Sequence, residues 1–231
     1  MGNKGQRKRQ KRISMQKSIS IARKEHVWAI RTNPGAHKKE LSVPLGTVIR
    51  DYLKLATNLR EVKTILREKQ VKVDGKVRED IAFCVGLFDV VGIDKEKKQF
   101  RMLLDKKQRI YAKEMTEKEN TKIARIEHKH VTSKGIQVTT SDGRIFSGIS
   151  ARVGDSLKIN FESNKVDKVL EMKEGASVYV IGGSHAGKTA KINAIIAGTQ
   201  AREKLIKLEQ NGEEFETIVK NIFVIEKTGD F

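Results

Sequence analysis

The hydrophobic and polar positions between residues 41 and 93 form the clearest pattern in the chain. Pro44 suits the first turn of a helix, where its missing N–H costs nothing, and apolar residues then recur at helical spacing. The positions expected to face a core are Leu45, Val48, Ile49, Tyr52 and Leu53. The pattern therefore predicts a first short helix that ends near Leu55.

A second helix is predicted a few residues later. Thr57 or Asn58 can cap its N-terminus, and Glu61 lies three residues past Asn58, as in a capping box. Its expected buried stripe consists of Leu59, Val62, Ile65 and Leu66. Because helical residues three and four positions apart share one face, this stripe predicts a helix that packs on one side only.

Both predicted helices also carry a row of cations. Arg60, Lys63 and Arg67 are three or four residues apart, which places them along one side of the second helix. Arg50 and Lys54 have the same relation on the first helix. These rows predict basic faces that could meet a polyanion. An ordinary solvated helix face is the alternative, since charge is usual on exposed helix surfaces.

The pattern changes from helical to alternating after the second helix. Val71 and Val73 alternate with Lys72, as expected for a half-buried strand. Asp74-Gly75 then supplies the residues that a two-residue type I′ hairpin turn needs. A strand pair is therefore expected to follow the two helices.

The order of these elements resembles a known RNA-binding domain. Two helices precede the hairpin V-x-V-D-G-K-V and the hydrophobic strand V-G-x-x-D-V-V, which together span residues 71–91. Ribosomal protein S-four, tyrosyl-tRNA synthetases and pseudouridine synthases share a domain with this arrangement, and the resemblance covers about a quarter of the chain. Because the helices of that family present basic side chains to RNA, the resemblance implies that the two basic rows contact RNA.

Residues 94–170 alternate apolar and polar positions in several short runs. The runs centre on Met102, Val138 and Ile159, and the turn signals are Ser141-Asp142-Gly143 and Gly154-Asp155. Short strands with turns at such spacing predict a small barrel or half-barrel. The one helical expectation in this part of the chain spans residues 112–120.

Three side chains in these segments are of types that act as nucleophiles or metal ligands, but their surroundings do not favour either role. Cys84 lies in an apolar strand, where a buried small hydrophobic residue is much commoner than a nucleophile. His128 and His130 share one strand face, yet no cysteine or second histidine pair accompanies them as a metal site would need. No metal, no cofactor and no catalytic residue is therefore predicted.

The last segment contains a match to the phosphate-binding loop of nucleotide triphosphatases. Residues 182–189, GGSHAGKT, satisfy the pattern G-x-x-x-x-G-K-T and follow a predicted strand. Such a loop needs a helix packed on a parallel sheet and an acidic residue from another strand. Asn211-Gly212 instead predicts an antiparallel hairpin. A P-loop enzyme is therefore the less favoured alternative.

Residues 174–195, EGASVYVIGGSHAGKTAKINAI, are more similar to the KOW motif of ribosomal and transcription proteins. The matching positions are Gly175, Val178, Val180, Ile181, Gly183, Gly187, Lys188, Ala190 and Ile192. Glycine-rich turns let backbone come close to phosphate, so the loop around Lys188 could contact RNA without hydrolysing a nucleotide. The resemblance implies an SH3-like β-barrel.

Net charge is the most informative property of the composition. The net charge is +18, and residues 1–40 contribute 12 lysines and arginines against two glutamates. Such an excess displaces counterions from phosphates and steers association with nucleic acid, although an anionic membrane is another candidate partner. The sequence has no apolar run long enough to span a bilayer and no signal-like apolar core, so a cytoplasmic protein is expected.

Residues 1–40 are expected to form a basic arm that lies along RNA. The opening GNKGQRKRQKR is too polar and too charged to bury anything, and the arm would be disordered in isolation. Apolar residues, Trp28 among them, are then interspersed with cations such as Arg23 and Arg31. A solvated tail or a nuclear localisation signal is the alternative, because a basic run alone fits either.

Together the elements predict an α+β, multidomain protein. The expected domains are the arm at 1–40, the S-four-type RNA-binding module of two helices and a small sheet at 41–93, a β-rich central domain at 94–171 and an SH3-like β-barrel KOW domain at 172–231. This order resembles the archaeal and eukaryotic ribosomal S-four-e (S4e) family over essentially the whole chain.

The resemblance to that family implies a structural constituent of the small ribosomal subunit, located in the cytoplasm, that binds and stabilises small-subunit ribosomal RNA. It also implies neighbouring small-subunit proteins as partners, and neither enzymatic activity nor a membrane nor a homo-oligomer is expected. An RNA-modifying or tRNA-charging enzyme that uses the helical module as an accessory is the alternative, but the chain lacks room for a catalytic domain.

The side chains expected to contact RNA are cations, with one aromatic ring among them. They are Lys4, Arg7, Lys8, Arg9, Lys11, Arg12, Lys17, Arg23, Lys24, Trp28, Arg31, Lys38, Lys39, Arg50, Lys54, Arg60, Lys63, Arg67 and Lys188. Phosphate contacts from such side chains would supply affinity, and the fixed geometry of the helical pair would select an RNA shape.

Overall fold

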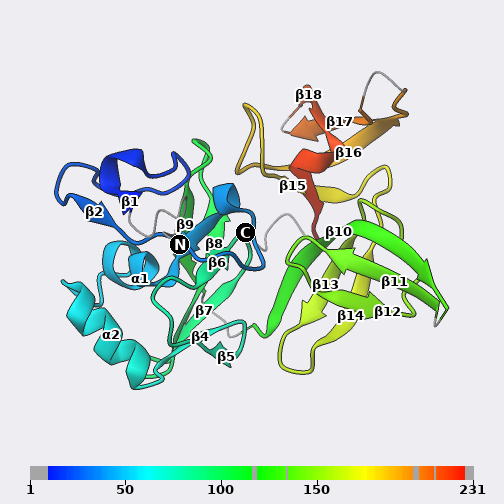
Figure 1. The fold of residues 1–231 in the computed structure, drawn as a ribbon. Coiled ribbons are helices and arrows are strands. Elements are labelled where there is room, and N and C mark those ends of the chain that lie inside the picture. Colours follow the sequence, from blue (N-terminus) through cyan, green and yellow to red (C-terminus); the bar gives the residue numbers. More distant parts are fainter. Residues whose placement is uncertain (1–9, 116–118, 134, 200–202, 211, 227–231) are drawn as a thin grey trace, which may run out of the picture. The chain divides into compact units, whose positions relative to one another are not determined.

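The structure, a computed structural model, divides into two compact units (Figure 1). It describes residues 10–115, 119–133, 135–199, 203–210 and 212–226. The first unit comprises residues 10–102 and 109–115, and the second comprises 103–108 and the described residues from 119 onward. The arm and the two predicted helices therefore belong to the same unit.

The first unit combines short helical segments with small antiparallel sheets. Its helical segments are η1 (Arg12–Ser14), η2 (Lys39–Leu41), α1 (Leu45–Thr47), η3 (Val48–Tyr52) and α2 (Leu59–Arg67). Its strands are β1 (Gln10–Lys11), β2 (Trp28–Ala29), β3 (Ser42–Pro44), β4 (Val71–Val73), β5 (Lys76–Val77), β6 (Cys84–Gly86), β7 (Val90–Ile93), β8 (Lys98–Leu104) and β9 (Ile110–Glu114). The last two residues of β8 belong to the second unit. β1 pairs with β2, β3 pairs with β6, and the other five follow the order β5-β4-β7-β8-β9.

The first predicted helix is present but ends earlier than expected. Pro44 precedes the first helical residue, and α1 runs directly into η3, a π-helical segment in which the N–H of Leu53 donates to the carbonyl oxygen of Val48 at 2.9 Å. This wider turn closes the helix at Tyr52 rather than near Leu55.

The second predicted helix, α2, buries a narrower stripe than expected. Val62 and Leu66 are fully buried, and Ile65 is half-buried. Leu59 is 36% exposed, so it lies at the edge of the stripe and not in the core. The helix therefore packs through its middle and last turns.

The predicted hairpin after α2 is confirmed by its backbone angles. Asp74 and Gly75 have φ values of 49° and 74°, the left-handed conformations that a type I′ turn requires. The turn is also tied to the sheet, because the N–H of Val90 donates to Oδ1 of Asp74 at 3.1 Å. Cys84 is free and buried in β6, as its apolar surroundings predicted.

The sheet of this module continues past residue 93, where the module was expected to end. β7 pairs with β8 from Val90 opposite Arg101 to Ile93 opposite Lys98, and β9 follows as the next strand. The helix expected at 112–120 is wrong for residues 112–114, which lie in β9 because pairing with β8 decides their conformation. Residues 116–118 lie outside the described part of the chain.

The arm, which was expected to lie along RNA, also buries apolar side chains in the first unit. Met15, Ile19 and Ile30 are between 5% and 9% exposed. Ile19 forms a parallel bridge with Ile110, and the N–H of Ile110 donates to the carbonyl oxygen of Ser18 at 2.8 Å. The apolar residues among the arm's cations therefore anchor it to the first unit.

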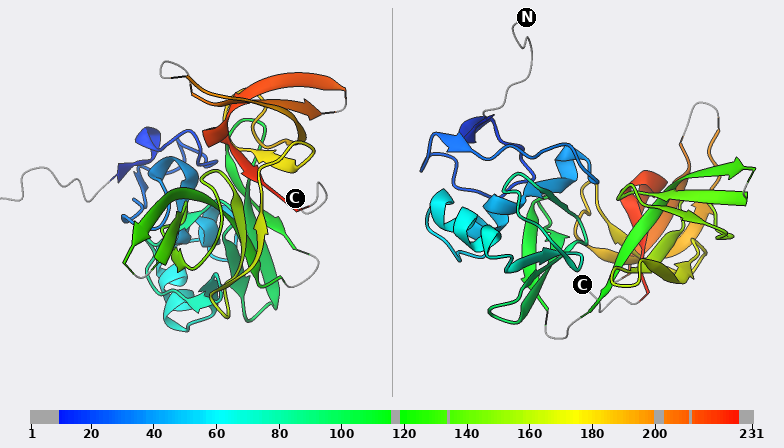
Figure 2. Two further views of the ribbon diagram at one scale, coloured as in Figure 1. Left: turned by 90° about the vertical axis from the view of Figure 1, so that its right-hand side faces the viewer. Right: turned by 60° about the horizontal axis from the view of Figure 1, so that its bottom comes forward.

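The second unit contains two antiparallel sheets, coloured green to yellow and yellow to red in Figure 2. The first sheet has the order β12-β11-β10-β13-β14 and the second β18-β17-β16-β15-β19. The strands of the first are β10 (Thr121–Thr132), β11 (Gly135–Thr140), β12 (Ile145–Ser147), β13 (Ser156–Asn160) and β14 (Lys165–Leu170). Those of the second are β15 (Ser177–Val180), β16 (Thr189–Ile196), β17 (Leu205–Gln210), β18 (Glu213–Ile218) and β19 (Ile222–Val224), with η4 (Val219–Asn221) before β19.

Each sheet of the second unit has an apolar core, and polar contacts connect the two. Leu157 and Ile159 are fully buried in the first core, as the alternation predicted, and Val178 and Leu208 are fully buried in the second. Arg125 of β10 donates from Nη1 to the carbonyl oxygen of Ile222 at 3.3 Å. Burial lowers the pKa of Arg125.

Candidate RNA-binding surface

The N-terminus of α2 is held by a reciprocal cap that sets the direction of its basic side. Asn58 accepts through Oδ1 from the N–H groups of Arg60 and Glu61 at 3.1 and 3.2 Å. Glu61 reaches back and accepts through Oε2 from the N–H of Thr57 at 2.7 Å. This backbone hydrogen bond from Thr57 is the main reason that the pKa of Glu61 lies below its ordinary value.

The cap and the buried stripe together leave the predicted basic trio in solvent. Arg60, Lys63 and Arg67 are all exposed, whereas Val62 and Leu66 on the other side of α2 are fully buried. The burial pattern therefore separates the two sets of side chains, as the sequence predicted. The trio is free to meet phosphates without disturbing the core.

The two predicted cations of the first helix have unequal surroundings. Arg50 is half-buried and donates from Nη2 to Oδ2 of Asp51 at 2.8 Å, so part of its charge is already compensated. Lys54 follows the helix, is exposed and has a φ of 55°. Of these two, Lys54 is the more accessible to a polyanion.

Arg12 occupies a position that the sequence analysis did not anticipate. It is 1% exposed, and its Nη2 donates to Oδ1 of Asp51 at 3.0 Å and lies 3.6 Å from Oε2 of Glu25. A guanidinium in this position is shielded from solvent and is already paired within the fold. The acidic residue within the otherwise basic first helix was the available signal, but a partner 39 positions away could not be identified from spacing.

The other predicted cations of the arm differ in exposure. Arg23 is half-buried and donates to the carbonyl oxygens of Ile13 and Gln16, both at 3.2 Å. The exposed ones are Lys11, Lys17, Lys24, Arg31, Lys38 and Lys39. Lys4, Arg7, Lys8 and Arg9 lie outside the described residues.

Four of the predicted RNA contacts line a single groove in the first unit. The groove has a volume of about 1230 Å³, and Trp28, Arg31, Lys39 and Arg50 contribute to its walls. Trp28 is 53% exposed. The groove thus brings residues of the arm together with one from the first helix, which their separation in sequence did not reveal.

The loop that contains Lys188 connects two antiparallel strands of the second unit. β15 pairs with β16 in the register Tyr179 opposite Thr189, and the N–H of Val180 donates to the carbonyl oxygen of Lys188 at 2.9 Å. A P-loop leads from a parallel strand into a helix, so this hairpin lacks the geometry for a nucleotide. Lys188 itself is half-buried.

The glycines of this loop are required by close packing. A Cβ on Gly187, whose φ is 76°, would lie 2.6 Å from the carbonyl oxygen of Leu104, in the same unit. The side chain of Gln108 also donates to the carbonyl oxygen of Gly183 at 2.9 Å. The match to the phosphate-binding pattern therefore reflects a tightly packed hairpin loop.

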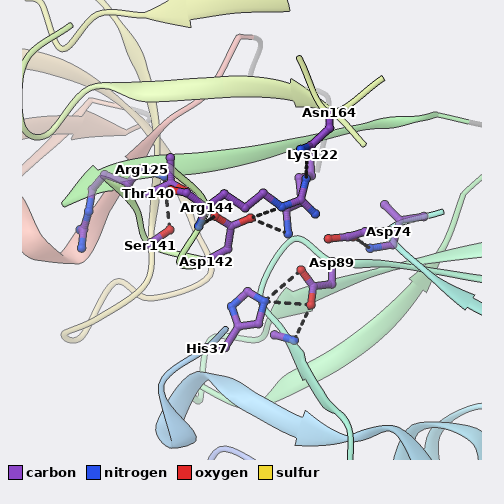
Figure 3. Close-up of polar contacts among 12 residues, drawn as sticks. His37, Asp74, Asp89, Lys122, Arg125, Thr140, Ser141, Asp142, Arg144 and Asn164 are labelled. Carbon is purple, nitrogen blue, oxygen red and sulfur yellow. Dashed lines mark hydrogen bonds and ion pairs between the residues drawn. The ribbon is translucent and has the colours of Figure 1, made fainter. Parts of the chain in front are cut away.

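A buried ion pair outside these surfaces stabilises the second unit, and sequence reasoning missed it. In the second unit, Nζ of Lys122 lies 2.9 Å from Oδ2 of Asp142, and both side chains are 3% exposed (Figure 3). Burial alone would raise the pKa of Asp142, but the charge of Lys122 and the hydrogen bond from Thr140 lower it overall. Since these residues are buried, they are not candidates for RNA contact.

A second pair lies in the first unit, where the half-buried His37 also lines the groove. Nε2 of His37 lies 2.9 Å from Oδ2 of Asp89, which also accepts from the N–H of Gly86 at 2.9 Å (Figure 3).

Among the described residues, no group of three or more His, Cys, Asp or Glu side chains could hold a metal ion. No described helix is long and apolar enough to cross a membrane. His128 and His130 are exposed, with ring centroids 6.1 Å apart.

Comparisons with known proteins agree on one family. Residues 96–166 match the model described as Ribosomal family S4e, and residues 4–40 match the RS4NT (NUC023) domain. The small ribosomal subunit protein eS4 of Methanosphaera stadtmanae is 36% identical over 228 residues, which is 97% of this chain and 95% of that protein. Small ribosomal subunit protein eS4C of Schizosaccharomyces pombe is 32% identical, with 98% and 88% covered.

A solved structure gives the same result for the fold. The crystal structure of 30S ribosomal protein S4e from Thermoplasma acidophilum is 32% identical and superimposes with a TM-score of 0.70. The match covers 80% of this chain and 95% of that one. Identity and coverage at this level extend the likeness well beyond the two short segments that the family models match.

Proposed function

The chain belongs to the S4e family of small ribosomal subunit proteins, and we propose that it binds and stabilises folded small-subunit ribosomal RNA as a structural constituent of that subunit. The observation that carries the proposal is the division of α2 into a buried apolar side and an exposed basic side. A charged surface that the core does not need is available to phosphates.

The basic trio of α2, Lys54 and the exposed cations of the arm supply the phosphate contacts. Each contact releases counterions from RNA, so affinity is largely electrostatic. The capped helix holds Arg60, Lys63 and Arg67 in a fixed arrangement, and such an arrangement selects RNA by shape, because the bases of an A-form helix are poorly accessible. Arg12 is excluded from this set because it is buried.

Residues 172–231 act as a KOW-type module with an SH3-like barrel, and the arm, the S-four-type module and the β-rich central region precede it. The five-stranded antiparallel sheet and the glycine-dependent loop at Gly187 support this assignment. The loop around Lys188 serves packing or RNA contact and not nucleotide hydrolysis. The chain acts among neighbouring small-subunit proteins, not as a homo-oligomer and without a cofactor.

Two measurements test this function. Tagged full-length protein should sediment with small-subunit particles on sucrose gradients, and the purified chain should bind a folded small-subunit rRNA fragment with an affinity that falls steeply with salt. The control is an unrelated basic protein of similar charge, which should bind without preferring the rRNA fragment to a random RNA. A chain that stays at the top of the gradient and binds RNA independently of salt would contradict the proposal.

A further inference from the structure

The groove in the first unit has the chemistry of a binding site for an unpaired nucleotide. Its volume is about 1230 Å³, and all of its lining residues belong to one unit. Trp28, which is 53% exposed, lines the groove together with the apolar residues Leu59 and Ile81. An exposed indole beside aliphatic side chains suits the flat face of a nucleobase, since bases stack on aromatic rings regardless of their sequence.

The charge of the groove suits an RNA strand. Arg31, Lys39 and Arg50 line it, and none of the residues that line it in the described part of the chain is acidic. Arg31 and Lys39 are exposed. Asp51 is paired with two cations, because it accepts hydrogen bonds from Arg50 through Oδ2 and from buried Arg12 through Oδ1. This shared carboxylate holds Arg50 in place at the groove.

The groove is formed by backbone that is already tied to the fold. Trp28 lies in β2 opposite Lys11 of β1, and the N–H of Arg12 donates to the carbonyl oxygen of Val27 at 2.9 Å. Further along the arm, the N–H of Asn33 donates to the carbonyl oxygen of Ala82 at 2.9 Å. A site that is ordered in advance loses little conformational entropy when a strand enters.

We propose that this groove binds a single-stranded segment of RNA and stacks one unpaired base on Trp28, with Arg31, Lys39 and Arg50 near the adjoining phosphates. A duplex is a poor occupant because its bases are already stacked on one another. This inference rests on the proposed function, because it names the form of RNA that one part of the surface takes. The helix α2 meets folded RNA through phosphates alone, whereas the groove takes a base.

Trp28 makes the test direct, because the chain contains one tryptophan. Full-length protein is titrated with a single-stranded hexa-adenylate and, separately, with an RNA duplex that has the same number of phosphates. Saturable quenching of the indole fluorescence by the single strand is expected, with much weaker quenching by the duplex. Equal quenching by the two RNAs would overturn the proposal, as would quenching by a hexaglutamate peptide and not by RNA.

Variants assign the effect to the groove. Binding of a dye-labelled hexa-adenylate, followed by anisotropy, should weaken about tenfold or more in Trp28→Ala and stay within about twofold in Trp28→Phe, because a phenyl ring still stacks. Val27→Ala is the matched control, since Val27 is 64% exposed and does not line the groove. Equal affinity of Trp28→Ala and the parent would overturn the proposal, provided that circular dichroism gives the same melting temperature.

The groove and the proposed function can fail separately. If the parent protein binds a folded rRNA fragment but no single strand, the groove assignment is wrong and the function stands. If it binds neither, the function itself is wrong. If Trp28→Ala loses the single strand while it retains the folded fragment within about threefold, both proposals are supported, because phosphate contacts on α2 carry most of the second affinity.

Discussion

Arg12 donates from Nη2 to Oδ1 of Asp51 at 3.0 Å, across 39 positions of sequence and with its own side chain 1% exposed. This ion pair joins the basic arm to the first helix of the RNA-binding module. Arg12 is thereby buried, although it belongs to the most basic stretch of the chain. The arm is therefore partly a structural element, and not all of its cations are available to bind RNA phosphates.

The first prediction concerns the stability that this pair provides. Asp51→Ala should lower the free energy of unfolding by about 3–5 kcal/mol, because it leaves a buried guanidinium without its main partner. The neighbouring cation Lys11 is exposed, so Lys11→Ala should change it by less than about 0.5 kcal/mol. Urea unfolding measures both. Equal values for the two variants would show that the ion pair does not stabilise the fold.

The second prediction separates RNA binding from stability on α2. Replacing Arg60, Lys63 and Arg67 together with Gln should leave the melting temperature nearly unchanged, because all three are exposed and Gln favours helix almost as well. The slope of log affinity for rRNA against log salt should fall by about 0.7–0.9 for each phosphate that the variant no longer neutralises.

The matched control for that variant removes the same charge elsewhere in the first unit. Lys76, Lys95 and Lys97 are exposed and lie outside the predicted RNA-binding set. Their replacement with Gln should reduce the salt slope much less. If both triple variants lose the same affinity, binding follows net charge and not the position of the cations on α2.

The third prediction tests the core side of the same helix. Leu66 is fully buried, so Leu66→Ala should cost about 2–5 kcal/mol through reduced burial and a cavity. Ile65 is half-buried, so Ile65→Ala should cost roughly half as much. Lys63→Ala serves as the exposed control. Chemical denaturation gives the three values, and a larger loss at Ile65 than at Leu66 would contradict the packing.

The fourth prediction concerns the loop that matches a phosphate-binding motif. Equilibrium dialysis with ATP or GTP and magnesium should detect no binding at micromolar concentrations, because an antiparallel hairpin offers no helix N-terminus to a triphosphate. The comparison variant is Lys188→Ala. A micromolar dissociation constant that this substitution abolishes would restore the nucleotide site.

The fifth prediction is a dependence of stability on pH in the second unit. The folded pKa of Asp142 lies below its ordinary value of 3.8, so its ion pair stabilises the fold above that pH and is lost as the pH falls through the folded pKa. The free energy of unfolding should therefore fall below about pH 4. In Asp142→Asn this fall should be shallower, whereas Asp167→Asn, at an exposed position, should behave like the parent.

The local features of the RNA-binding module could be predicted because their causes lie within a few residues. The reciprocal cap at Asn58 and Glu61 needs only a spacing of three, and the Asp74-Gly75 turn needs only two residues that tolerate a positive φ. The buried stripe at Val62 and Leu66 follows from helical periodicity. Family resemblance rested on the order of these same elements.

The spacing of residues along the sequence could not identify which distant segments pack or pair with one another. The helix expected over residues 112–120 gave way to β9, since pairing with β8 outweighs local preference. The first helix was expected to run further, but a π-helical turn ended it at Tyr52. The hairpin of β15 and β16 turned a match to the phosphate-binding pattern into a packed loop at Gly187.

The start of α2, its buried side and the concentration of charge could be predicted from the sequence, because these depend on neighbours along the chain. The burial of Arg12 against Asp51 and the groove that Trp28 and Arg50 share became visible only in the folded chain. A side chain's exposure and its partner are set by whichever distant segment packs against it, and a linear pattern carries no record of that choice.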